Sequence, residues 1–147
     1  MTAARAESSS PHPVRPTALD HVVLRVADLD RAVAFYRDVL GCTVEKWQRE
    51  LGLLQLRAGS ALIDLVTLDG PLGREGGTGP GPEGRNLDHF CIRLQMFDEP
   101  ALRAHLAAHG VGASATADRY GAEGYGPSIY IRDPDGNTVE LKAPPPA

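Results

Sequence analysis

The sequence predicts an α+β fold with two tandem βαβββ modules, whose sheets form a curved groove around a central site. Three observations support this prediction: a repeated segment, a helical pattern after each copy, and short alternating strands. The repeat is the clearest of the three, because Leu-Asp-His begins both residues 19–29 and residues 87–98. His89 follows His21 by 68 residues, so each half has a histidine at the head of its first strand.

Composition limits the classes of function. The chain has 147 residues, 42% of them hydrophobic, which is enough for one domain with an ordinary core. Its net charge is −4 and no basic stripe is visible, which argues against a nucleic-acid partner. No apolar run approaches the roughly 18 residues of a membrane span, and the N-terminus lacks the apolar core of a signal peptide. With only two cysteines, a disulfide framework is not expected, so we predict a cytoplasmic protein.

The organisation follows from the repeat and from glycine and proline content. The linker between the modules holds seven glycines and three prolines in 18 residues. The Ser-, Pro- and Ala-rich start of the chain is expected to be flexible. The predicted parts are a flexible N-terminal extension (1–17), one domain (18–143) with module 1 (18–68), linker (69–86) and module 2 (87–143), and a tail (144–147).

The first module begins with a two-faced strand over residues 19–26, in which apolar and mixed positions alternate. Asp28 is placed to cap a helix that runs to Leu40, and Gly41 is placed to end it. Three strands should follow, at 43–49, 52–58 and 61–67.

The second module repeats this order from residue 87. Asp98 should cap a helix over 99–109. The elements expected after it are a strand at 112–117, a Gly-rich loop at 118–127 that could act as a lid, a strand at 128–132, a tight turn at 133–137 and a last strand at 138–142.

Four residues form a pseudo-symmetric set of metal ligands. In each module the helix covers one sheet face, and the histidine of the first strand points to the other face, toward the groove. The last strands also match, with Asp64 opposite Glu140 in the overlay. Two imidazoles and two carboxylates suit one divalent metal such as Zn, Ni, Mn, Fe or Co, and the ligand types do not choose among these. Asp64 is one methylene shorter than Glu140, so contact through water is the alternative to direct ligation. The predicted ligands are His21, His89, Glu140 and Asp64.

Several motifs resemble the vicinal oxygen chelate superfamily, which includes glyoxalase I, bleomycin-resistance proteins, fosfomycin-resistance thiol transferases and extradiol dioxygenases. The motifs are Leu-Asp-His-Val-Val-Leu-Arg-Val-Ala-Asp-Leu, Ala-Val-Ala-Phe-Tyr-Arg-Asp-Val-Leu-Gly, Leu-Asp-His-Phe and Tyr-Ile-Arg-Asp-Pro-Asp-Gly-Asn-Thr-Val-Glu-Leu. The resemblance covers residues 19–142. It implies ligand roles for both histidines and for Glu140. Glyoxalase I-like members have a Glu where this chain has Asp64, whereas dioxygenases and fosfomycin enzymes use three protein ligands, so this position leaves the branch open.

The chemistry of such a site defines the expected function. A metal that binds two adjacent substrate oxygens polarises a carbonyl and stabilises an enediolate. A neighbouring carboxylate can then remove a proton from the adjacent carbon, with Glu140 as the first candidate base and Asp64 as the second. The leading hypothesis is a metal-dependent glyoxalase-like lyase or isomerase. The alternatives are an extradiol-type dioxygenase, a non-catalytic drug- or metabolite-binding protein, and a fosfomycin-type thiol transferase.

Three further residues are candidates for substrate contact. Arg25 shares the groove face with His21, and in the glyoxalases that the chain resembles an arginine here meets a glutathione carboxylate. Arg93 is its repeat partner, and Tyr130 could form part of a pocket wall. The expected partners are therefore a small-molecule substrate, possibly thiol-conjugated, and a second copy of the chain in a homodimer, the usual assembly of the family.

Overall fold

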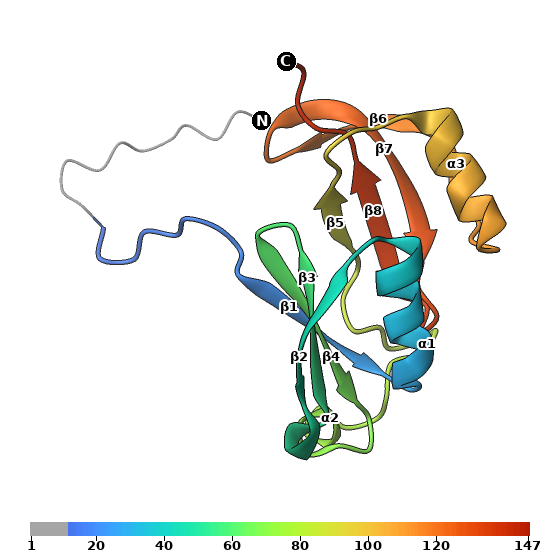
Figure 1. Cartoon of the computed structure of the whole chain (residues 1–147). Helices are drawn as coiled ribbons and strands as arrows, with labels where there is room; N and C mark the ends of the chain where they lie inside the picture. Colours follow the sequence, from blue (N-terminus) through green and yellow to red (C-terminus); the bar gives the residue numbers. More distant parts are fainter. Residues whose placement is uncertain (1–11) are drawn as a thin grey trace.

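The computed structural model describes residues 12–147. The first module is a four-stranded sheet with one covering helix (Figure 1). Strand β1 pairs in parallel with β4, and β4, β3 and β2 follow in antiparallel order. Helix α1 continues as a π-helical turn over Phe35–Val39, and Gly41 ends it with a φ of +73°. The elements are β1 (His21–Val26), α1 (Leu29–Ala34), β2 (Thr43–Gln48), a 3₁₀ turn (Arg49–Leu51), β3 (Leu53–Ala58) and β4 (Ala61–Thr67).

The second module repeats the topology of the first. Its sheet has the order β5-β8-β7-β6, again with one parallel pair, β5 with β8. Asp98 accepts a hydrogen bond from the backbone N–H of Ala101 and so caps α3, as Asp28 caps α1. The elements are β5 (Phe90–Arg93), α3 (Glu99–Ala108), β6 (Ala117–Gly121), β7 (Gly124–Arg132) and β8 (Thr138–Lys142).

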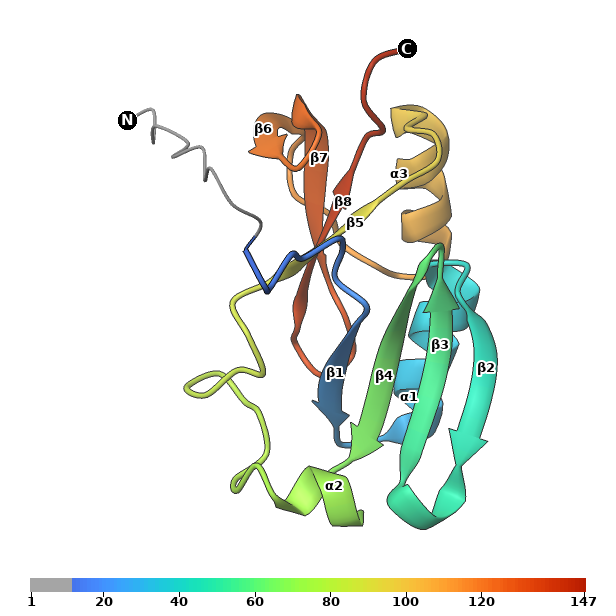
Figure 2. The ribbon, with the colours of Figure 1, turned by 90° about the vertical axis from the view of Figure 1, so that its left-hand side faces the viewer.

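The predicted α+β class with two similar βαβββ modules is confirmed. In the single chain the two sheets are separate and are not closed into a barrel (Figure 2). Buried apolar side chains from both modules form one continuous core. Its centre includes Leu24 on β1, Leu65 on β4 and Ile131 on β7, all at most 1% exposed. Each sheet therefore buries one side in this core, and the candidate site residues lie on the other side.

Two polar contacts hold the modules together at the turn before β8. The hydroxyl of Tyr36, in the π-helical turn after α1, donates a 2.6 Å hydrogen bond to the buried carboxylate of Asp133. The backbone N–H of Ala27 donates to Asp135 at 2.8 Å. Burial against Asp133 raises the pKa of the Tyr36 hydroxyl far above its ordinary value, so this donor keeps its proton.

The segment before β8 corrects the sequence prediction. Residues 112–116 form no strand, and the expected loop at 118–127 is a hairpin made of most of β6 and the first part of β7. Gly124, with a φ of +94°, allows the tight connection between them. The glycines had indicated a loop, but they also leave space on the sheet face, as described below. The irregular loop is therefore a wrong expectation, and a lid role for this hairpin stays a prediction.

The linker contains regular structure and hydrogen bonds to the first module, whereas residues 12–17 of the N-terminal segment form no helix or strand. A short helix, α2 (Pro71–Arg74), lies within the predicted linker, and the Arg25 guanidinium donates hydrogen bonds to the linker carbonyls of Gly73, Gly77 and Thr78. Of the predicted flexible extension, residues 1–11 lie outside the described residues. Residues 12–17 are exposed and contain no helix or strand. Among the helices of residues 12–147, none is both long and apolar enough to cross a membrane.

Candidate functional site

The first pair of candidate ligands lies on β1 and β4. The His21 side chain is on the sheet face opposite the core and is 46% exposed. Asp64 lies on the neighbouring strand, opposite Val23 in the parallel register. His21 Nδ1 is 2.7 Å from Asp20 Oδ2, and this hydrogen bond, with the nearby charge of Asp64, raises the pKa of His21. The bond to Nδ1 leaves Nε2 as the atom that faces a ligand.

Asp64 has an oxygen that no described residue satisfies. The residue is only 3% exposed, and Gln55 Nε2 donates to its Oδ2 at 3.2 Å. Its other oxygen, Oδ1, is buried and has no hydrogen-bond partner among residues 12–147. Burial raises the pKa of this carboxyl. A buried carboxylate oxygen without a partner is costly, and a metal ion or a water molecule would satisfy it.

The second pair lies immediately before β5 and on β8. His89 Nε2 is 3.4 Å from Glu140 Oε1, and Glu140 is 6% exposed. His89 Nδ1 is 2.6 Å from Asp88 Oδ2, and this hydrogen bond lowers the pKa of Asp88. The Tyr130 ring packs edge-on against the imidazole, with the ring centroids 5.6 Å apart. The second imidazole is therefore held by a carboxylate on one side and an aromatic ring on the other.

Sequence reasoning missed the hydrogen bonds of Asp20 and Asp88. Each aspartate lies within hydrogen-bond distance of Nδ1 of the histidine that follows it, which orients the imidazole and leaves Nε2 for another ligand. The signal was present, because the repeat is Leu-Asp-His rather than His alone. Gln55, which supports Asp64, had no signal in the sequence, because only the pairing of β3 with β4 places it there.

The structure of one chain brings the four predicted ligands together as two pairs, not as one cluster. Within residues 12–147 no three His, Cys, Asp or Glu residues lie close enough to hold a metal. The donor types nevertheless fit a divalent first-row metal, since each pair offers an imidazole and a carboxylate. The unsatisfied Oδ1 of Asp64 is the observation that supports this fit.

The three predicted substrate contacts are placed differently. Tyr130 lies beside His89 and pairs with Glu140 across β7 and β8. Arg93 forms a 2.6 Å ion pair with Glu123. Arg25 binds the carbonyls of the linker, so its guanidinium holds that segment against β1. Substrate binding by all three stays a prediction.

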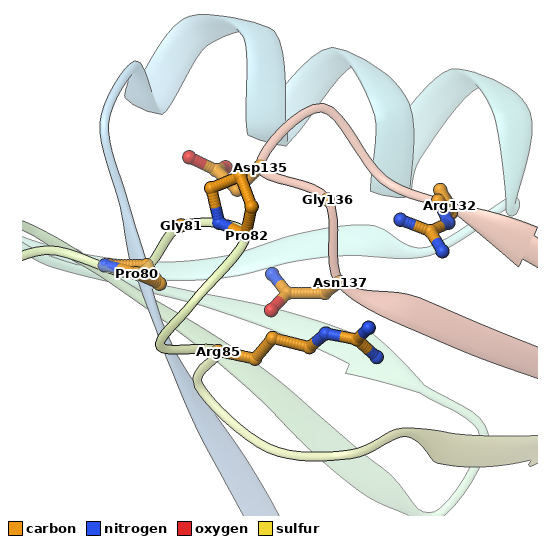
Figure 3. A pocket seen from close by; sticks show the side chains of 8 residues that line it. All are labelled: Pro80, Gly81, Pro82, Arg85, Arg132, Asp135, Gly136 and Asn137. Carbon is orange, nitrogen blue, oxygen red and sulfur yellow. The ribbon is translucent and has the colours of Figure 1, made fainter.

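A small hollow of about 190 Å³ lies between the linker and the turn before β8. Figure 3 shows Arg85 of the linker and Arg132 at the end of β7 beside it, with Asn137 between the two segments. Asn137 is buried and bonds to Asp133 and Asn86, which makes it part of the scaffold. None of the four predicted metal ligands lines this hollow.

The fold places the chain among proteins built from two βαβββ modules. The paired histidines and carboxylates add a candidate metal site on the sheet faces opposite the core. Residues 18–141 match the Glyoxalase/Bleomycin resistance protein/Dioxygenase superfamily, and the chain belongs to that superfamily. A glyoxalase domain-containing protein of Mycosarcoma maydis is 33% identical over 127 residues, covering 86% of this chain and 68% of the relative.

Two solved structures extend the comparison. An integron cassette protein from the mobile metagenome of V. cholerae has a TM-score of 0.70 and 28% identity, covering 88% of this chain and 97% of its own. A lactoylglutathione lyase from Agrobacterium tumefaciens has a TM-score of 0.63 and 27% identity, covering 87% of this chain and 94% of its own.

Proposed function

We propose that the protein is a metal-dependent lyase or isomerase of the glyoxalase type, acting on a small substrate with two adjacent oxygens. The observation that carries the proposal is the doubled pair, in which an aspartate-held histidine lies on the same sheet face as a buried carboxylate. The similarity to a lactoylglutathione lyase supports this branch of the superfamily.

The metal would be held by His21, Asp64, His89 and Glu140. When bound, it would polarise the carbonyl of the substrate by acting as a Lewis acid. Asp20 and Asp88 fix the two imidazoles, so that each directs Nε2 toward the metal position. Glu140 is the first candidate for moving the proton from the carbon beside the carbonyl, because its carboxylate is buried next to an imidazole. Asp64 is the second candidate.

We further infer that the complete site forms between two copies of the chain. In one chain the two pairs lie on separate sheets, and no third ligand reaches either of them within the described residues. The open face of the first sheet carries Val23, which is 50% exposed on β1 between His21 and Arg25. A homodimer that packs the first sheet of one copy against the second sheet of its partner would cover this face. It would also join two half-sites into one four-ligand centre.

A mixing experiment tests the metal site and its placement together. The variants His21→Ala and Glu140→Gln should each fail to retain Zn²⁺ or Co²⁺ when purified alone. If the two variants are refolded together, a mixed dimer with shared sites has one site with both changes and one site with none. Random pairing should then restore about a quarter of the wild-type metal content. No restoration would contradict the shared site, and full metal retention by both single variants would contradict the ligand set.

The reaction needs a separate assay. The metal-loaded protein should convert the adduct of methylglyoxal with a thiol, measured by absorbance of the thioester product, and should leave catechols intact. Cleavage of catechols with Fe²⁺ would favour the dioxygenase alternative. A protein that holds metal but converts neither substrate class would contradict the proposed reaction while leaving the metal site in place.

A further inference from the structure

A buried lysine lies on the same sheet face as Glu140, two residues further along β8. Lys142 is only 7% exposed, although an ammonium group is normally solvated. Alternate residues of a strand share a face, so Lys142 points to the open side that holds Glu140 and not into the helix-covered core. Two residues of strand separate the two positions by roughly 7 Å.

Two glycines make space for this side chain. A Cβ at Gly121 would lie 2.8 Å from Lys142 Cε, and a Cβ at Gly126 would lie 3.0 Å from Lys142 Nζ. The lysine therefore extends from β8 across β7 and β6, and any larger residue at these positions would displace it. The glycine content that suggested a loop has a specific effect here, because it creates a channel for one long cationic side chain.

The ammonium group has no partner in the part of the chain that the structure describes. No hydrogen bond or ion pair of Lys142 Nζ is formed within residues 12–147, and Glu123, in the turn of the adjacent hairpin, is paired with Arg93 at 2.6 Å. Nζ is not sealed in the interior either, since it is absent from the fully buried atoms without a partner. It therefore contacts solvent on this side of the sheet.

A second cation lies beside it on the same face. Arg119 on β6 pairs with Gly126, the residue over which Nζ ends. Its Nη1 donates to the carbonyl and hydroxyl of Ser128 at 2.7 and 2.9 Å, and its guanidinium stacks on Tyr130 at 4.3 Å from the ring centroid. All these partners are neutral, so they orient the guanidinium without cancelling its charge.

The first module provides an internal comparison. On β4, two residues beyond Asp64, the position equivalent to Lys142 is Val66, which is 2% exposed and needs no partner. A buried apolar residue thus satisfies this place in the fold. The second module instead buries a charge, which costs free energy unless an opposite charge compensates for it.

We propose that Lys142 and Arg119 form an anion subsite that binds a carboxylate, phosphate or similar oxyanion group of the substrate. As a statement about the substrate, this rests on the proposed function. The Lys142 side chain extends along β7 toward Gly126, on the side of Ser128 away from Tyr130 and Glu140, so the anionic group would bind at a distance from the reacting carbon. An anion would satisfy both cations and would bring a negative substrate into a protein of net charge −4.

The experiment measures anion binding to the metal-free full chain, so that it does not depend on the metal site. Inorganic phosphate and acetate are titrated into the protein by calorimetry at pH 7 and low ionic strength. Lys142→Met should weaken binding of the better anion by about tenfold or more, because a charged hydrogen bond is lost. Lys46 is the only other lysine of the chain and is exposed on β2, so Lys46→Met is the matched control.

A second pair of variants moves the ammonium group and keeps its charge. Gly121→Ala would displace the lysine side chain and should also weaken binding, whereas Gly112→Ala, whose Cβ would meet nothing within 4 Å, should not. Absence of anion binding by the wild type, or equal binding by wild type and Lys142→Met, would overturn the proposal. An equal loss in Lys46→Met would overturn it too, since that indicates general charge attraction. Metal content of the wild type is measured separately, so failure of the metal site is a distinguishable result.

Discussion

The two pairs proposed as half-sites each combine a histidine with a carboxylate, but the carboxylates differ. In the second, Glu140 reaches to 3.4 Å from the imidazole of His89. In the first, Asp64 forms no ion pair with His21, and instead accepts a hydrogen bond from Gln55 while its Oδ1 is left unsatisfied. The residues paired with the two carboxylates differ as well, with Gln55 opposite Asp64 and Tyr130 opposite Glu140.

This difference shows that one methylene group decides whether the carboxylate reaches its histidine within one chain. The glutamate is long enough to bring its Oε1 to 3.4 Å from Nε2 of its histidine, so the two side chains of the second pair meet within one chain. The shorter aspartate stays in the sheet, where an amide holds one of its oxygens in place. We therefore expect the second half-site to contribute most of the metal affinity and the first to complete the coordination.

The largest expected effect comes from the glutamate. Glu140→Gln keeps the size of the side chain but removes its charge, and should weaken Zn²⁺ binding by more than about 100-fold. Asp64→Asn should weaken it less, by about tenfold. Competition with a chromophoric chelator measures both affinities. Equal losses in the two variants would contradict the unequal roles of the half-sites.

The next effect concerns the aspartates that hold the histidines. Asp88→Asn and Asp20→Asn should each weaken metal binding by about 10- to 100-fold, as expected for partners of metal-bound imidazoles. Asp20→Asn should also lower the pKa of His21, because the bond to Asp20 is the main cause of its raised value. NMR titration of the imidazole in the metal-free protein measures this pKa. An unchanged pKa would mean that Asp20 does not control the first imidazole.

Asp64 should also make the stability of the metal-free protein depend on pH. Burial raises the pKa of this carboxyl above its unfolded value, so the folded state holds the proton more tightly. The stability that protonated Asp64 contributes is thus present below the unfolded pKa and is lost as pH rises through the folded pKa. Relative to wild type, Asp64→Asn should gain melting temperature as pH rises from about 4 to 7. Thermal unfolding in a chelating buffer tests this, and a constant difference across the range would contradict it.

Much of the fold was predictable from the sequence because its signals are local. The strand alternation around His21, the caps at Asp28 and Asp98 and the left-handed glycine at position 41 act over a few residues. The hairpin of β6 and β7 was not predictable in this way, since its glycines are typical of loops. The role of Gly121 and Gly126 depends on the sheet pairing, because β8 pairs with β7 and its Lys142 side chain lies over both glycines.

The candidate site likewise combines residues that a local motif indicates with contacts that only the tertiary structure determines. The sequence selects His21, His89 and the two carboxylates as candidates because the repeat marks equivalent positions, and their roles as ligands stay predictions. The grouping of these residues within one chain could not be predicted, since it depends on how two separate sheets pack and on whether a second copy takes part. The effect of Gln55 on Asp64 likewise arises from strand register and not from any motif.

The smallest expected effect on metal affinity comes from removing the hydrogen bond between Gln55 and Asp64. Gln55→Leu removes the amide that donates to Asp64 Oδ2, and this bond opposes the rise in the pKa of the carboxyl caused by burial. Without the bond the pKa should rise further, so protons should compete with metal for Asp64 at higher pH. We expect metal affinity to fall by about two- to fivefold at pH 7, and by more at pH 6. Gln48→Ala is the matched control, because Gln48 donates to Gln55 at 3.1 Å and does not contact the carboxylate. It should leave the pH dependence of metal binding nearly unchanged. If both variants shift it equally, the first half-site depends on the whole glutamine pair and the single amide contact is not what distinguishes it from the second.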